Sequence, residues 1–341
     1  MGKNPVIRVE VEPEPKEYIE EFIRFRRITK NITPNTEREY RRYLSSFIEE
    51  LGGEEEIGKG NERKTVLDWL EKPMEGGIHG VKKVLSNGTF NRKRAYIRAF
   101  FRWLREEYEG MLPTDPLKGI PKRKEEHRKI TFGIDAVKAV EEELYRIYIE
   151  TPKMINLRNF LEFVFICAVG TRGTETGSFG REHIDVKSSM VFLPAAITKT
   201  RQSRHVPLPF IDPGTWMNKK TKKGAKSRFQ KLFEAYYRAH EEAYPDPSVP
   251  FFCSQTGQPL RSTALWQAIK PAMRACGLDV PPHDLRHFAL TQIAFHGGAA
   301  AVQAIAGHTS PVMTARYINP SAEMVCGMGL EAIKRANDLR I

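Results

Sequence analysis

The sequence has few cysteines, and they are not arranged like metal ligands or disulfide partners. Cys167, Cys253, Cys276 and Cys326 lie far apart in a chain of 341 residues, and no two of them form a C-x-x-C pair. This spacing argues against a structural zinc site and against a framework of disulfides. We therefore expect reduced thiols, no metal site and no cofactor.

Long apolar runs are also missing. The longest, 163–169, is too short to cross a bilayer, and the N-terminal stretch from Met1 to Pro5 lacks the apolar region of a secretory signal. We expect a cytoplasmic protein that has no membrane partner.

Acidic residues are a minority. The chain carries 54 Lys and Arg against 42 Asp and Glu, a formal net charge of +12. Nucleic acid is the commonest partner of so basic a protein, although ribosomal and lipid-binding proteins share this property.

Apolar periodicity predicts a mainly α fold in two domains. After a loose arm at 1–15, helix stripes at 18–28, 33–51, 62–70 and 91–108 indicate an all-helical domain over 16–110. A linker rich in proline and basic residues follows at 111–129. Residues 130–341 read as a mixed α/β domain, with helices at 134–149, 156–169, 262–275 and 321–339. Three β-prone runs, 190–193, 196–199 and 205–208, indicate a small antiparallel sheet with Lys199 at the tip of its last hairpin.

Basic side chains occur at positions suited to a phosphate backbone, on the outer sides of two helices, in the linker, on the hairpin and in a dense cluster after it. The alternative is that they form ordinary solvated faces. The candidate DNA contacts are Arg38, Arg41, Arg42, Arg92, Lys93, Arg94, Arg98, Lys122, Arg123, Lys124, Arg201, Lys219, Lys220, Lys222 and Lys223.

The chemistry-bearing residues concentrate near the end of the chain. His283-x-x-Arg286, Gly307-His308 and Tyr317 combine a planar fork of donors, imidazoles and a possible nucleophile. Upstream, Arg172 follows the end of an apolar helix, where a cation needs an anionic partner, and Glu175 is a plausible one. Taken singly, each has a plainer interpretation: His283 as a helix cap, Arg286 as a solvated side chain, and His308, Tyr317 and His287 as interior residues.

The ordered set resembles the tyrosine recombinases, the phage integrase family. The residues that carry this resemblance are Arg172 with Glu175, Lys199, His283, Arg286, His308 and Tyr317, together with the Arg-x-Val-Pro-Leu strand at 204–208. Residues 33–36 with Tyr40, and Asp115-Pro116, are similar to the family's N-terminal core-binding domain. Four glycines, at 170, 173, 177 and 180, surround Arg172 and depart from the family's usual glycine-poor context.

The resemblance implies a site-specific DNA recombinase that works through a 3′-phosphotyrosine intermediate without metal or ATP. Arg172 and Arg286 would clamp the phosphate, His308 would bond to it, His283 would assist Tyr317, and Lys199 would protonate the leaving oxygen. It also implies double-stranded DNA with a specific site, a dimer on each site and a tetrameric synapse, and we expect helix 321–339 to pack on a neighbouring subunit. The alternatives are a type IB topoisomerase and a noncatalytic DNA-binding protein of the same fold.

Overall fold

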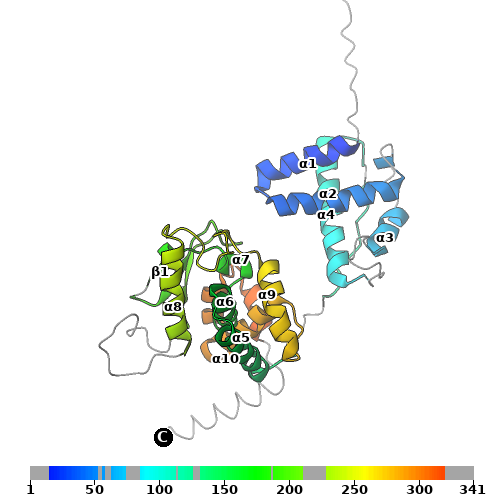
Figure 1. Ribbon diagram of the computed structural model, residues 1–341. Helices are drawn as coiled ribbons and strands as arrows, with labels where there is room; N and C mark the ends of the chain where they lie inside the picture. The colour runs from blue at the N-terminus through cyan, green and yellow to red at the C-terminus, as the bar shows by residue number, and fades with distance from the viewer. Residues whose placement is uncertain are drawn as a thin grey trace, which may run out of the picture. The chain divides into compact units, whose positions relative to one another are not determined.

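A computed structural model describes residues 15–52, 56–57, 63–73, 85–112, 114–125, 131–185, 187–209 and 228–318. The chain divides into two compact units, residues 1–127 and 128–341 (Figure 1). The predicted arm at 1–15 (apart from Pro15), the predicted helix at 321–339 and the basic cluster at Lys219, Lys220, Lys222 and Lys223 lie outside the described residues.

The described part of the first unit is helical, as predicted. Its helices are α1 (Pro15–Lys30), α2 (Pro34–Leu51), α3 (Arg63–Glu71) and α4 (Asn87–Glu107). The hydroxyl of Thr33 caps α2 by accepting a hydrogen bond from the Thr36 amide at 3.3 Å, and Gly52 ends the helix at φ +97°. Helix α4 begins four residues earlier than expected because Ser86 caps it in the same way.

The core of this unit lies where α4 crosses α1 and α2 (Figure 1). Part of the predicted linker belongs to it, since Leu112, Leu117 and Ile120 are buried against the helices. The apolar side chains between the prolines thus hold residues after 110 to the first unit, and the division of the chain after residue 127 falls within the predicted linker.

The second unit is built around one helix. Helix α6 (Met154–Val169) contacts α5 (Ile134–Glu150), α8 (Arg228–Ala243), α9 (Ser262–Ala275) and α10 (Pro282–Ala306). Ten of its 16 residues are buried and seven of these are apolar, as its apolar composition predicted, while Arg158, Asn159 and Glu162 are buried polar residues. The short helices α7 (Gly173–Thr176) and α11 (Pro311–Ile318) and a 3₁₀ turn at Arg181–His183 complete the described helical elements.

A three-stranded antiparallel sheet completes this unit, in the order β1 (Ile184–Asp185), β2 (Met190–Leu193), β3 (Arg204–Pro207). The prediction of a small antiparallel sheet is confirmed, but the strand at 196–199 was wrong. Pro194 begins a series of turns there, in which Ile197 and Thr198 donate back to Pro194 and Ala195. Two-residue β1 was missed because it is too short to show alternation.

Helix α10 is long and apolar enough, by length and composition alone, to cross a membrane. It is a poor candidate for a span, because it carries Arg286 in its buried first half and is broken by the non-helical backbone of Gly298. Its first half instead packs on α6 in the core of the second unit.

Candidate active site

The site begins at the turn that follows α6. Gly170 ends α6 at φ +69°, and a Cβ added there would lie 3.0 Å from the Leu290 side chain. Glycine is therefore needed both for the left-handed turn and for the approach of α10. Gly173 and Gly177 likewise lie too close to Ser262 and to the Leu260 carbonyl to carry a side chain. Close packing thus explains the unusual glycines around Arg172.

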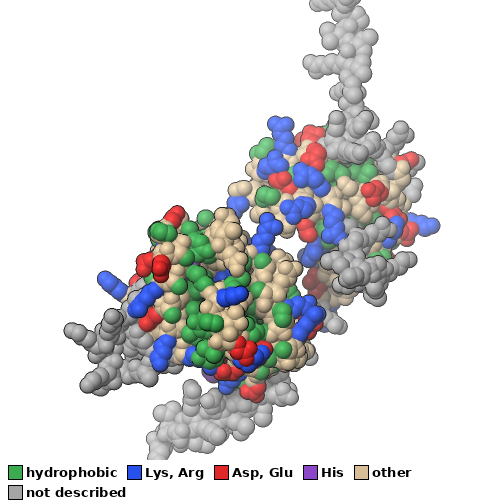
Figure 2. All heavy atoms as spheres, in the orientation of Figure 1, with side chains coloured by type: hydrophobic (Ala, Val, Ile, Leu, Met, Phe, Trp, Pro, Cys, Tyr) green, Lys and Arg blue, Asp and Glu red, His purple; other side chains and the backbone are tan. Residues whose placement is uncertain are grey.

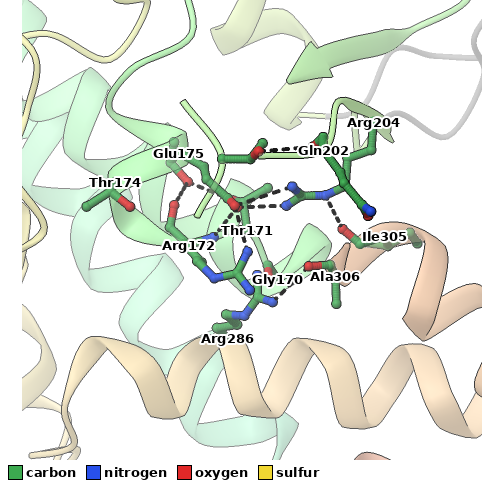
Figure 3. A network of polar contacts seen from close by, with 12 residues as sticks. Gly170, Thr171, Arg172, Thr174, Glu175, Gln202, Arg204, Arg286, Ile305 and Ala306 are labelled. Atoms are coloured by element: carbon green, nitrogen blue, oxygen red, sulfur yellow. Dashed lines mark hydrogen bonds and ion pairs between the residues drawn. The ribbon is translucent and has the colours of Figure 1, made fainter. Parts of the chain in front are cut away.

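Glu175, in this turn, lies between Arg172 of the same turn and Arg204 of β3 (Figure 3). One carboxylate oxygen accepts from Arg172 Nη1 at 2.7 Å, and the other accepts from Arg204 Nη2 at 2.7 Å and from the Arg172 amide at 3.0 Å. Burial opposes ionisation of this fully buried carboxyl, but the Arg204 and Arg172 contacts outweigh it and hold the pKa below the ordinary value. The predicted pairing of Arg172 with Glu175 is present.

Arg286 joins the turn after α6 to the far end of α10. The side chain is 3% exposed and donates to the Gly170 carbonyl at 2.5 Å and to the Ala306 carbonyl at 3.2 Å. Burial and the neighbouring charge of Arg172 lower its pKa to about 10, so it remains a cation at neutral pH. The positive charges of Arg172 and Arg286 are thus close enough to repel, and a bound anion would offset this repulsion.

His308 and Tyr317 follow directly after α10. Gly307 ends the helix at φ +64°, and His308 Nδ1 lies 3.1 Å from the Thr314 hydroxyl. The His308 ring stacks on the Tyr317 ring with centroids 5.6 Å apart. Tyr317 is 7% exposed and packs with Leu290 in a small separate cluster.

The start of α10 brings the imidazole of His287 to Tyr317 and that of His283 beside His287. The His287 ring lies 4.7 Å from the Tyr317 ring and 5.4 Å from that of His283. Desolvation by the surrounding protein atoms, and then the positive charges of Arg286, Arg172 and Lys199, lower the pKa of His283, although the residue is exposed at the surface. His283 is therefore neutral at neutral pH and able to accept a proton.

Lys199 lies exposed in the loop between β2 and β3. The Thr198 hydroxyl beside it is buried and donates within this loop, to the carbonyls of Ala195 and Gln202. The residues predicted from sequence are thus brought to one region of the second unit. Arg204 and His287 had no assigned role: Arg204 was visible only as part of the strand motif, and His287 only as a neighbour of Arg286.

Two family models match the sequence. A model described as "Phage integrase family" matches residues 136–324, and one described as "Phage integrase, N-terminal SAM-like domain" matches residues 19–108. The chain belongs to the phage integrase family, the tyrosine recombinases.

Curated relatives in this family align with most of the chain. Tyrosine recombinase XerC of Yersinia pestis is 24% identical over 307 residues, which are 88% of each chain. Tyrosine recombinase XerD of Listeria monocytogenes is 25% identical over 307 residues, which cover 88% of this chain and 92% of the relative.

Solved integrases share the fold. A lambda integrase tetramer bound to a Holliday junction matches with a TM-score of 0.63 at 15% identity, covering 93% of this chain and 81% of that one. The Tn1549 transposon integrase in complex with transposon right end DNA matches with a TM-score of 0.62 at 16% identity, covering 93% and 99%.

Two of the predicted DNA contacts of this family member do not lie on an exposed face. Lys93 is 1% exposed and donates to the carbonyls of Trp69 and Lys72, and Arg94 is 6% exposed and donates to the Ile120 carbonyl. The expectation that both point away from the core was wrong, because backbone carbonyls inside the unit take up their donors.

The other described candidates remain at or near the surface. Arg38, Arg42, Arg92, Arg98, Lys122, Lys124 and Arg201 are exposed. Arg41 and Arg123 are half-buried and engaged in ion pairs with Glu20 and Glu71, respectively. Figure 2 shows the basic side chains of the first unit interspersed with acidic ones on the face in view.

Proposed function

We propose that this chain is a site-specific DNA recombinase that cleaves and rejoins strands through a 3′-phosphotyrosine intermediate, without metal or ATP. One observation carries the proposal. Arg172, Arg286, His308 and Tyr317, from separate stretches of the chain, converge around the end of α10.

The two arginines supply the electrostatic part of the reaction. The negative oxygens of a phosphodiester repel a nucleophile, and positioned cations neutralise them in the ground and transition states. Arg172 and Arg286 are both held in place by acceptors on one side, Glu175 for the first and two carbonyls for the second. A phosphate between them would offset their repulsion, with His308 hydrogen-bonding a nonbridging oxygen.

The remaining residues move protons. The Tyr317 oxygen attacks the phosphorus, forms the new P–O bond and releases the 5′-oxygen as the old P–O bond breaks. The phenolic proton passes toward neutral His283, with His287 between the two rings. Lys199 gives a proton to the 5′-oxygen, which leaves as a hydroxyl. Because the phosphodiester energy is kept in the tyrosine ester, another 5′-hydroxyl can reverse the attack and rejoin strands.

The substrate and assembly follow from the same proposal. The partner is double-stranded DNA carrying a defined site, in the cytoplasm, with a dimer on each site and a tetramer in the synapse. In support, the structural relative from lambda is a tetramer bound to a Holliday junction.

Covalent trapping tests the function. The full chain is incubated with a pool of random-sequence duplexes carrying a nick, so that cleavage beside the nick releases a short strand and traps the adduct. Wild type should give an SDS-resistant adduct at a defined sequence, and Tyr317→Phe should bind DNA normally but give none.

The outcomes separate this function from its rivals. An adduct formed by Tyr317→Phe would exclude this tyrosine as the nucleophile. No adduct with wild type would favour a noncatalytic DNA-binding protein. Relaxation of supercoils without exchange between two mapped sites would favour a topoisomerase.

A further inference from the structure

Arg204 lies at the point where three parts of the candidate site meet (Figure 3). It is the first residue of β3 and pairs with Leu193 at the end of β2, so it closes the loop that carries Lys199. Its side chain points away from that loop into the interior and is 8% exposed.

The hydrogen bonds of this side chain reach two other parts of the site. Nη2 and Nη1 donate to the two oxygens of Glu175 at 2.7 and 3.3 Å, and Nε donates to the Ile305 carbonyl at 2.7 Å. The planar fork of a guanidinium permits these bonds at once, which an ammonium cannot do.

The end of α10 is shaped to receive this arginine. The carbonyls of Ile305 and Ala306 belong to the last turn of α10, where carbonyls lack partners within the helix and the helix dipole favours a cation. Arg204 donates to the first and Arg286 to the second. A Cβ at Gly307 would lie 3.1 Å from Arg204 Cδ. The absence of a side chain at 307 leaves room for Arg204 directly before His308.

We propose, on the basis of the function proposed above, that Arg204 is a positioning residue for the general acid Lys199. It fixes the base of the Lys199 loop against the Glu175 turn and the end of α10. The loop is then held against the same two elements that position Arg172, Arg286 and His308. Without Arg204 the loop still carries Lys199, but its position relative to the phosphate is no longer fixed, so protonation of the 5′-oxygen slows.

A sulfur substitution at the leaving atom isolates this step. The mapped site is made as a nicked duplex with either the natural oxygen or a bridging sulfur at the scissile 5′ position. A thiol ionises with a pKa of about 8.5, far below an alcohol, so the sulfur leaves without a proton from the protein. A defect confined to protonation therefore disappears on the sulfur duplex.

The variants are Arg204→Met and Arg204→Lys. Each should cleave the oxygen duplex about 100-fold more slowly than wild type, the scale of a general-acid contribution, and should cleave the sulfur duplex within about threefold of wild type. Lys199→Ala should show the same pattern, and Arg172→Ala should lose cleavage of both duplexes. Arg204→Lys keeps a cation beside Glu175 and serves if Arg204→Met does not fold.

Arg181 provides a matched control. Its side chain is 4% exposed in the same unit and donates to the carbonyls of Tyr244 and Pro245, away from the candidate site. Arg181→Met should lower stability yet leave the ratio of sulfur to oxygen cleavage unchanged.

The results discriminate clearly. Equal losses on both duplexes in a folded, DNA-binding Arg204→Lys protein, or no loss on the oxygen duplex, would overturn the positioning role. Wild type that cleaves neither duplex would instead refute the recombinase function itself.

Discussion

Two buried glutamates in the second unit have pKa values shifted in opposite directions. Glu162 on α6 and Glu175 in the turn after it are both fully buried. The oxygens of Glu175 accept from two arginines, whereas those of Glu162 have no hydrogen-bond partner among the described residues. Burial raises the pKa of Glu162 to about 8 although Arg158 opposes it, while the pKa of Glu175 is held below its ordinary value.

The contrast shows that hydrogen-bonded cationic partners, rather than the extent of burial, decide whether these two carboxyls are charged. Glu175 is an anion that fixes two cations of the candidate site, and Glu162 is a neutral acid at and below neutral pH. The two carboxyls should therefore give stability opposite dependences on pH.

Neutralising Glu175 should have the largest effect. Glu175→Gln leaves Arg172 and Arg204 without a counter-charge, and removing one partner of a buried pair costs about 3–5 kcal/mol. Because the folded pKa is depressed, the stabilisation is present above the unfolded pKa of 4.5 and is lost as pH falls below it.

Urea unfolding at pH 7 and at pH 4 measures this effect. The variant should be much less stable than wild type at pH 7, and the gap should narrow at pH 4. A loss below about 1 kcal/mol at pH 7 would show that Glu175 does not neutralise the two arginines.

Glu162→Gln should act in the opposite direction. Below pH 4.5 wild-type Glu162 is protonated in both states and the variant should be similar. Between pH 4.5 and about 8 the folded state holds a proton that the unfolded state releases, so wild type loses stability as pH rises. At pH 9 the variant should be more stable by roughly 5 kcal/mol, an order-of-magnitude figure from a pKa raised from 4.5 to about 8.

The measurement is the midpoint of urea unfolding across this pH range. A variant whose stability runs parallel to that of wild type would mean that Glu162 finds a charge partner in the folded protein.

Much of the fold could be predicted because the signals that mark a helix lie close together in the sequence. The apolar stripe of α2, its cap at Thr33 and its stop at Gly52 all lie in adjacent sequence. The turns at 194–200 could not be separated from a strand, because Ile197, Thr198 and Thr200 are β-branched residues that favour strands, and only Pro194 indicates otherwise.

The candidate site residues could be named from the sequence, but the contacts that hold them in place could not. Arg172, His283 and Tyr317 stand in a recognisable order. Arg286 and Arg204, however, are fixed by carbonyls of Gly170, Ala306 and Ile305, and a backbone carbonyl carries no sequence signal. Long-range packing of α10 on α6 supplies these partners.

In the first unit the same comparison can be made with a buried cation, and here we expect the smallest effect. Among the described residues no carboxylate bonds to Lys93, which lies over the Trp69 ring, and burial lowers its pKa to about 8. Arg98, five residues further along the same helix, is exposed and lines a cavity of about 350 Å³ with Arg102 and Arg105.

If exposure decides which cations meet DNA, Lys93→Met should leave DNA affinity unchanged, whereas Arg98→Ala should weaken binding to all sequences and reduce the slope of log affinity against log salt by about 1. Titration of a labelled duplex at several salt concentrations gives both quantities. A reduced slope in a folded Lys93→Met protein would mean that this lysine leaves the core when DNA binds, and that its carbonyl partners hold it less firmly than the two arginines hold Glu175.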